Sequence, residues 1–342
     1  LDCLVGSEMC IRDSIYWKQP TSHEASDLVK LGQDLSFDNY NPGLITDGLS
    51  SSSSVTQNSN NIEIYGSNGY SVIFDESNTY TGSTTIKSGG RLKLLNNLPN
   101  SDILVETGGE LVISGENIEI KSLEVQDGAT VTMSEGNGLR IENDLYTDVL
   151  FSMSSSSTEY SSLIVDGTSS GEINYDRYVN EYSDNQTDNP QWDLVGSPVE
   201  GQPIDLFAIM NAQSGNLVTA PNLNDGSTYY GIGPFDNSLS SGWPSVYDSN
   251  TIPSTNFPIC SGYQMATVSG GAVLTFSGSL ASAPQTKNIT DNSSSGGTQW
   301  NLIANPFPSY LNLNSAADAT NNFITENGLS VYGWSADGSG TY

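Results

Sequence analysis

The chain has 342 residues, and its 10 Lys and Arg against 39 Asp and Glu give a formal net charge of −29. This charge excludes nucleic acid as a natural partner, because binding a polyanion requires clustered Lys and Arg that neutralise phosphates. An anionic membrane surface is disfavoured for the same reason. The 34 Gly, the 14 Pro and the serine runs predict an all-β protein of short strands and polar turns, and the length favours two domains of about 150 residues.

Residues 1–14 do not show the sequence pattern of a folded domain. The run from Cys3 to Ser14 resembles the conceptual translation of a transposase sequencing adapter, so we expect residues 1–14 to be an artefact. Without Cys3 and Cys10, Cys260 alone provides neither a disulfide framework nor a paired-cysteine metal site. We also expect truncation after Tyr342. No apolar run approaches the ~18 residues of a membrane span, so we expect no membrane insertion.

Short bursts of alternating apolar and polar residues extend from about Asn61 to Asp144, and each burst predicts a half-buried strand. The bursts repeat, since those at 90–94, 109–113 and 129–133 begin at a regular spacing of about 20 residues. Matching half-repeats that precede glycine turns lie at residues 84–86, 103–105 and 123–125. Two strands per period of this length indicate a β-solenoid, in which the inward Leu, Ile and Val of successive rungs stack.

Residues 78–94 resemble the autotransporter-associated β-strand repeat. The resemblance lies in a Tyr-Thr-Gly sequence, a Thr-Thr pair, and glycine followed by alternating leucines. Repeats of that family build right-handed parallel β-helices outside Gram-negative cells, and the resemblance implies the same architecture here. We therefore predict a right-handed parallel β-helix over residues 15–170, with irregular first rungs.

The spacing becomes irregular after about residue 170, where the aromatic, Pro and Asn content rises, so we place a domain boundary there. An internal duplication follows, because residues 191–198 and 299–306 match at Gln, Trp, Leu and Pro. Each copy predicts a buried strand that ends at a proline turn. Between the copies, residues 262–268 and 272–278 alternate like a hairpin around two glycines. We predict an antiparallel β-sandwich-like module with two related halves over residues 171–342.

This second half also resembles the module that precedes the sorting tail in large proteins exported by type IX secretion. In that family Trp-x-Leu-(Val/Ile)-x-x-Pro occurs twice, with glycine-rich strands between the copies. The matching elements here, in the family's order, are Trp192 to Pro198, Gly262-Tyr263, Phe276 to Leu280, Trp300 to Pro306 and Val331 to Trp334. The resemblance implies export to the extracellular space or the outer surface of a Gram-negative cell, through a sorting domain that we expect beyond this chain.

Few residues are suited to nucleophilic catalysis. Such catalysis needs a base, and the single histidine, His23, lies in a polar segment where a solvated loop is expected. Cys260 precedes a predicted strand and is expected to be a small buried side chain.

Parallel β-helices also include polysaccharide lyases and hydrolases, so an enzyme must be weighed. Lyases of acidic polysaccharides use Arg or Lys, and the predicted solenoid contains Lys87, Arg91, Lys93, Lys121 and Arg140. All but Lys121 take outward strand positions, as solubilising charges do. The spacing of the five cations does not place them together on one rung. The hydrolase motifs Asn-Thr-Asp, Asp-Asp and Arg-Ile-Lys do not occur. Carboxylate pairs such as Glu116/Glu119 and Glu172/Asp176 are expected among 39 acids, so we predict no catalytic site.

Two weaker binding sites are predicted. Calcium, the one cofactor considered, suits clustered oxygen ligands on turns, although Asn and Asp are also ordinary turn residues. Its candidate ligands are Asp184, Asp188, Asp193, Asn224 and Asp225. Aromatic rings in a Gly/Ser/Pro-rich stretch could stack on sugars or pack beneath a loop, and these are Tyr229, Tyr230, Trp243 and Tyr247.

The sequence therefore predicts a non-enzymatic secreted or cell-surface protein, an adhesin or stalk-type structural and interaction segment. Its expected partners are an extracellular polysaccharide or the surface of a host or neighbouring cell. The alternative is an accessory or carbohydrate-binding part of a secreted polysaccharide-degrading enzyme. Convergence of carboxylates and cations on one face would favour the enzyme, and an outer face of Ser, Thr and Asn would favour the stalk.

Overall fold

The computed structural model describes residues 81–182, 192–281 and 283–311, residues 61–64 and 72–74, and three short strands before them. The chain divides into two compact units. The solenoid unit comprises residues 1–154 and 161–173, and the C-terminal unit comprises residues 155–160 and 174–342.

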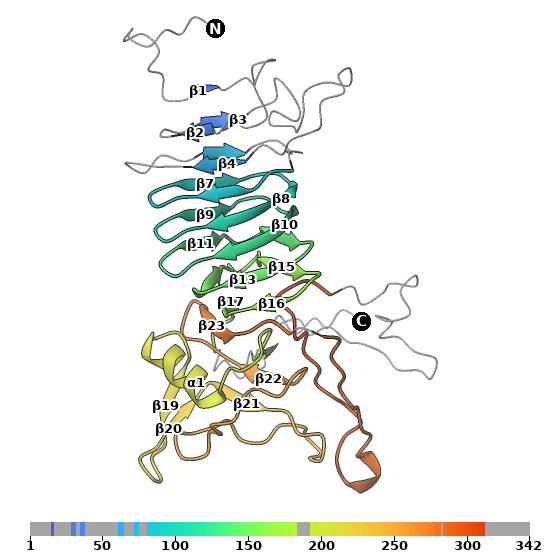
Figure 1. Cartoon of the computed structure of the whole chain (residues 1–342). Coiled ribbons are helices and arrows are strands. Elements are labelled where there is room, and N and C mark those ends of the chain that lie inside the picture. The colour runs from blue at the N-terminus through green and yellow to red at the C-terminus, as the bar shows by residue number, and fades with distance from the viewer. Residues whose placement is uncertain are drawn as a thin grey trace, which may run out of the picture. The chain divides into compact units, whose positions relative to one another are not determined.

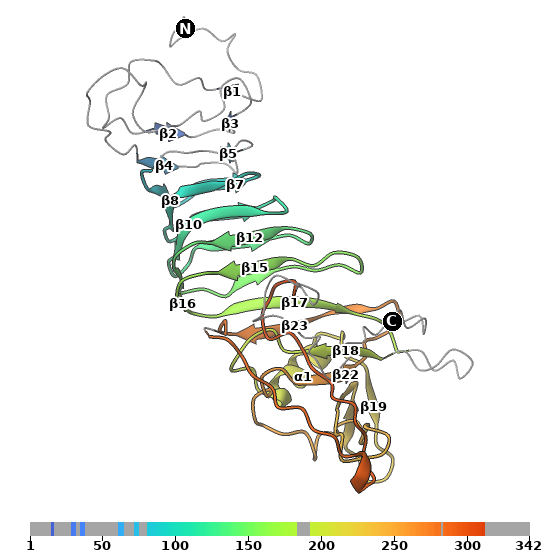
Figure 2. The same cartoon turned by 90° about the vertical axis from the view of Figure 1, so that its right-hand side faces the viewer.

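The solenoid unit is a parallel β-solenoid, as predicted, in which successive strands alternate between two sheets (Figures 1 and 2). The first sheet contains, in order, β1 (Ile15–Tyr16), β3 (Leu35–Phe37), β5 (Val72–Phe74), β7 (Arg91–Leu94), β9 (Glu110–Ile113), β11 (Thr130–Met133) and β14 (Phe151–Met153). The second contains β2 (Val29–Leu31), β4 (Ile62–Ile64), β6 (Thr84–Ile86), β8 (Leu98–Val105), β10 (Ile118–Val125), β12 (Gly138–Ile141) and β15 (Ser162–Val165).

The length of a rung changes along the solenoid. Arg91 pairs with Glu110 and Glu110 pairs with Thr130, which gives these rungs the predicted length of about 20 residues. Further along, β10 pairs with β12 through its first half and with the short strand β13 (Leu145–Thr147) through its second half. The strand β16 (Ser169–Ser170) then pairs with β13, and the register of Leu145 with Ser169 makes this rung longer than the earlier ones.

The core follows directly from the alternation in the sequence. In β7, β9 and β11 the inward residues are fully or almost fully buried, and they are Leu92, Leu94, Leu111, Ile113, Val131 and Met133. Each stacks on its counterpart in the next rung, because the registers align Leu92 with Leu111 and Leu111 with Val131. A continuous apolar ladder therefore fills the solenoid.

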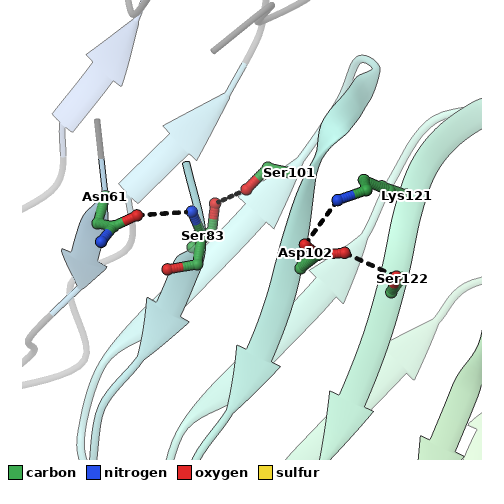
Figure 3. A network of polar contacts seen from close by, with 7 residues as sticks. Asn61, Ser83, Ser101, Asp102, Lys121 and Ser122 are labelled. Carbon is green, nitrogen blue, oxygen red and sulfur yellow. Dashed lines mark hydrogen bonds and ion pairs between the residues drawn. The ribbon is translucent and has the colours of Figure 1, made fainter. Parts of the chain in front are cut away.

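Side-chain hydrogen bonds join consecutive rungs at their corners. The Asn61 Oδ1 accepts a bond from the Ser83 backbone N–H at 2.9 Å (Figure 3), and the Asn97 Oδ1 accepts one from the Glu119 N–H at 2.9 Å. Inside the solenoid, the fully buried Thr84 and Ser101 hydroxyls share a 2.8 Å hydrogen bond. Polar groups at bends in the chain are thus satisfied by the neighbouring rung.

The C-terminal unit contains several small elements. The strands β17 (Ile173–Val179) and β23 (Ala272–Gly278) pair, and β18 (Asp193–Gly196), β22 (Gly262–Met265) and β21 (Ile232–Pro234) form an antiparallel sheet with β22 in the centre. A second antiparallel pair consists of β19 (Thr219–Pro221) and β20 (Thr228–Tyr230), and a 3-10 turn, η1, spans Ser293–Ser295.

The helix α1 (Ile204–Gln213) was not anticipated by the strand pattern. It follows Pro203, a residue suited to helix starts, and has Asp205 in its first turn. Its buried residues are Ile204, Phe207, Ala208 and Asn211, the spacing of one helical face. This helix is too short to cross a bilayer, and the described residues contain no helix that is long and apolar enough to do so.

Three side-chain amides bind the backbone of β23. The Gln202 Oε1 accepts a hydrogen bond from the Ser277 N–H at 2.8 Å. The Asn211 amide bonds both the N–H and the carbonyl of Thr275, at 3.0 and 3.3 Å. The Asn216 Nδ2 donates to the Val273 carbonyl at 2.9 Å. These amides supply the partners that a further strand would otherwise provide.

The predicted hairpin around Gly270-Gly271 is wrong. Both glycines have positive φ, and the Gly271 N–H donates to the Val268 carbonyl, so a turn does form. The flanking strands β22 and β23, however, belong to different sheets. Alternation predicts that each segment is a strand but does not identify its partner.

The two copies of the duplicated motif share several contacts. The Ser197 Oγ accepts a bond from the Val199 N–H, and at the equivalent position the Asn305 Oδ1 accepts one from the Phe307 N–H. The first copy forms β18, as predicted. The second copy is not the buried strand that we expected, because it makes one isolated bridge, from Ile303 to Ser261, and Ile303 is exposed.

Candidate functional site

Four cations of the solenoid, Lys87, Arg91, Lys121 and Arg140, bind carboxylates on neighbouring rungs. Lys87 lies 2.6 Å from Glu106 and 3.7 Å from Glu63, and the Arg91 Nε lies 3.1 Å from Glu110. These pairs join positions that the rung period brings into register. The cations therefore act between rungs, and they do not gather at one exposed centre.

Asp102 on β8 receives two partners from β10 (Figure 3). The Lys121 Nζ donates to the Asp102 Oδ2 at 2.8 Å, and the Ser122 hydroxyl donates to the Oδ1 at 2.7 Å. Partial burial raises the pKa of Asp102, but the bonds from Lys121 and Ser122 and the Lys121 charge together lower it below its ordinary value. The carboxylate is thus held ionised.

A half-open recess of about 300 Å³ lies on the outer face of the second sheet. Its lining residues are Pro99, Glu119, Ile120, Arg140, Glu142 and Asp166. Glu119 on β10 is in register with Arg140 on β12, and Asp166 follows β15 on the next rung. The recess therefore joins residues from four successive rungs, and it is a candidate site of the solenoid unit.

Arg140 contacts carboxylates on both neighbouring rungs of this recess. Its Nε donates to the Asp166 Oδ2 at 2.7 Å, and a terminal nitrogen lies 3.9 Å from Glu119. The hydrogen bond from Arg140 to Asp166 and the charge of that carboxylate raise the pKa of the guanidinium above its ordinary value. Arg140 is therefore held as a cation between two carboxylates.

The same contacts disfavour hydrolysis by a carboxylate pair. Glycosidases place the scissile bond between two carboxyl groups. Here the Arg140 guanidinium lies between Glu119 and Asp166 and bridges them. What the recess offers to a ligand is hydrogen bonding to exposed carboxylates beside the half-buried ring of Pro99.

The predicted calcium ligands are distributed over separate elements. Asp184 and Asp188 lie outside the described residues. Asp193 on β18 accepts hydrogen bonds from the backbone and side-chain nitrogens of Asn180 at 2.9–3.1 Å. Among the described residues, no group of three or more His, Cys, Asp or Glu side chains could hold a metal ion. Calcium binding through these residues stays a prediction.

Asn224 and Asp225 lie in the turn between β19 and β20. The Asp225 Oδ1 accepts bonds from the Ser227 N–H at 2.9 Å and the Ser227 hydroxyl at 2.7 Å. The Asn250 amide reaches the Oδ2 at 3.3 Å. The bonds from Ser227 lower the pKa of Asp225, as expected for a residue that stabilises its own turn.

Three of the four predicted aromatic residues come together. The Tyr230 N–H donates to the Tyr247 carbonyl at 2.9 Å, and Tyr229 forms an antiparallel bridge with Asp248. Tyr230 and Tyr247 therefore share one face, and Tyr229 points to the other. Trp243 packs separately, edge-on against Phe235 with ring centroids 4.9 Å apart. All four aromatic side chains are half-buried.

Cys260 is buried, as expected, and has a positive φ of 56° that the sequence did not indicate. Burial raises the pKa of its thiol, which keeps it in the unreactive protonated form. His23 lies outside the described residues.

The recess around Arg140 was not predicted from the sequence, although Arg140 was considered as a possible lyase residue and Glu119 as part of a carboxylate pair. A signal did exist, since the separation of Glu119 and Arg140 along the chain is close to the length of one rung. Comparison of this chain with family models, with curated proteins and with solved structures finds no match.

Proposed function

We propose that this chain is a structural and interaction segment of a secreted or cell-surface protein, of the adhesin or stalk type. The observation that carries the proposal is the use of the solenoid cations. Lys87, Arg91, Lys121 and Arg140 each bind a carboxylate on another rung, so these ion pairs tie successive rungs together.

The architecture suits a load-bearing segment. Each rung hydrogen-bonds its backbone to the next, the apolar ladder is continuous, and the ion pairs cross rung boundaries. Stability in such a stack is close to a sum over rungs and their interfaces, so length can be added without a special residue. The net charge of −29 favours solubility.

Single-molecule force spectroscopy on the full chain, held by its two ends, tests the mechanical part of this proposal. We expect the solenoid to lengthen in successive steps of about 65–70 Å, the extended length of about 20 residues. Extension without resolved steps at very low force would contradict a stalk. Protease treatment of intact source cells tests the location, since a surface protein is cleaved without lysis.

A carbohydrate-binding part of a polysaccharide-degrading enzyme is the second candidate. The recess around Arg140 favours it, because carboxylates and a cation converge there on one face, and so does the shared face of Tyr230 and Tyr247. Calorimetry with neutral and acidic polysaccharides tests binding, and release of reducing or unsaturated ends tests cleavage. Loss of binding in Tyr230→Ala but not in Tyr229→Ala would support this candidate, because the two rings lie on opposite faces.

A further inference from the structure

Arg177 on β17 is used differently from the paired cations of the solenoid. The ion pairs of the described residues all lie in the solenoid unit, and none of them includes Arg177. Its guanidinium instead lies over the ring of Tyr160, with the Cζ 3.9 Å from the ring centroid. Contact with a ring face engages the charge of a guanidinium but none of its five N–H donors. No described residue accepts a hydrogen bond from this half-buried side chain, so its donors are available to a ligand.

The contact between Arg177 and Tyr160 is fixed by the backbone around it. A short loop is closed by an antiparallel bridge between Ser155 and Tyr160. The Ser155 hydroxyl accepts a hydrogen bond from the Tyr178 N–H at 2.7 Å, which joins the loop to β17 one residue from Arg177. The guanidinium and the ring are therefore positioned before any ligand arrives, which lowers the entropic cost of binding.

Two further tyrosines lie beside this pair. The Tyr310 hydroxyl donates to the Tyr160 carbonyl at 3.2 Å, and Tyr310 is 70% exposed. Tyr175 precedes Arg177 by two residues on β17, so both side chains lie on the same face of the strand. Burial raises the pKa of the Tyr175 hydroxyl, and the nearby Arg177 charge offsets part of that increase. All four residues belong to the C-terminal unit, and we call Tyr160, Tyr175, Arg177 and Tyr310 the arginine–tyrosine cluster.

The cluster fits one kind of ligand group. The planar guanidinium of an arginine matches a carboxylate, because two parallel N–H groups can bind both oxygens. The net charge of −29 repels a densely charged polyanion, so the carboxylate must be isolated on an otherwise neutral molecule. The exposed Tyr310 ring adds an apolar face with a polar hydroxyl, which suits a sugar ring that has C–H groups on its face and hydroxyls at its edge.

We propose that the arginine–tyrosine cluster binds a carboxylated sugar, such as a uronic acid unit, within an otherwise neutral polysaccharide. Arg177 donates hydrogen bonds to the carboxylate, and the Tyr310 ring packs against the sugar. This inference rests on the proposed polysaccharide partner and specifies its chemistry. The C-terminus of a peptide carries the same carboxylate without the sugar ring, and the test below separates it from this proposal.

A ligand-observed NMR titration of the full chain with two matched sugars is the direct test. Methyl glucuronide and methyl glucoside differ only in that a carboxylate replaces a CH₂OH group. We expect the glucuronide to bind at least ~10-fold more tightly, the effect of one hydrogen bond to a charged group. Arg177→Gln should make the two affinities equal. The matched control is Lys93→Gln, which removes the same charge from an outward position of β7 and should leave the preference intact.

Three results would overturn the proposal. One is equal affinity for both sugars, or binding of neither, in the unmodified chain, which depends on no variant. Another is a preference for the glucuronide that survives in Arg177→Gln. The third is binding of N-acetyl-diglycine as tightly as the glucuronide, which would assign the cluster to peptide C-termini. Each of these would leave the stalk proposal standing, since the force steps of the solenoid do not involve Arg177.

Discussion

The corners of the solenoid use adjacent glycines for two different reasons. Gly89, Gly108 and Gly128 have φ values of 75–78°, a conformation that side chains rarely adopt. Gly90 and Gly109 instead lie so close to the previous rung that a Cβ would collide with the Ile64 and Ile86 carbonyl oxygens. At residues 89–90 and 108–109 the first glycine makes the turn and the second permits the rungs to approach, whereas at the third corner Gly128 is followed by Ala129.

These two roles predict different sensitivities to alanine. Gly90→Ala should lower the free energy of unfolding of the solenoid by about 2–4 kcal/mol, because rigid backbone blocks the added methyl group. Gly128→Ala should lower it by about 1 kcal/mol, since its nearest neighbour, the Thr107 methyl at 3.1 Å, can move. Urea denaturation of both variants measures the difference, and equal losses would refute the distinction.

The Asp102 carboxylate makes the solenoid sensitive to acid. Its pKa is lower in the folded chain than its ordinary value near 4, so its contribution to stability is present above that value and is lost as pH falls below it. Because the side chain is half-exposed, we expect this contribution to stay below about 1 kcal/mol. The melting temperatures of the native chain and of Asp102→Asn should therefore differ at pH 7, and the difference should shrink as the pH falls below about 4. A gap that widens in acid would contradict this account.

At the level of elements, the sequence predicted what depends on local periodicity. The strands β7, β9 and β11 were placed by their regular spacing along the chain and by alternating apolar positions. Partners in the C-terminal unit were not predictable in this way, and β22 and β23 were wrongly joined. The helix α1 was missed because only a short segment carries its pattern, next to a proline.

The candidate site illustrates the same limit. Arg140, Glu119 and Asp166 meet only because three rungs of unequal length align in register. The period in the sequence predicted that rungs stack, but the longer rungs after β10 shift the register by a few residues. The ion pairs across rungs therefore required the structure.

The amides that bind β23 provide a prediction at this scale. Asn211 is buried and makes hydrogen bonds to Phe207 and to both backbone groups of Thr275. Asn211→Leu should lower the free energy of unfolding by about 2–3 kcal/mol, because it leaves these backbone groups unsatisfied. Met210→Leu, at the exposed neighbouring position of α1, should change it by less than about 0.5 kcal/mol. Chemical denaturation measures both variants. If Asn211→Leu lost as little free energy of unfolding as Met210→Leu, the hydrogen bonds of the Asn211 amide would be unimportant.

For the whole molecule, the dominant property is the charge of −29. Repulsion among carboxylates destabilises the compact state, and dissolved ions weaken this repulsion. Sodium chloride at physiological concentration should therefore raise the melting temperature above its value at low salt. Lower stability in salt would mean that the ion pairs between rungs outweigh the repulsion.

Specific calcium binding would add an effect that ionic strength cannot mimic. At constant ionic strength, EDTA should lower the melting temperature of the full chain and excess calcium should restore it, while magnesium should restore it poorly. The described turn carboxylates are largely engaged by protein donors, so any such site would draw on Asp184 or Asp188 as well. An unchanged melting temperature would remove calcium from the account.

The amides of Gln202, Asn211 and Asn216 also affect how the protein behaves at high concentration. The exposed rim of a flat sheet can recruit strands from other molecules and grow into fibrils. On β23 the groups that would recruit them, the Val273 carbonyl, both Thr275 groups and the Ser277 N–H, already have partners within the same chain. These four groups are thus closed to strand addition by other copies of the chain, even where the protein is concentrated.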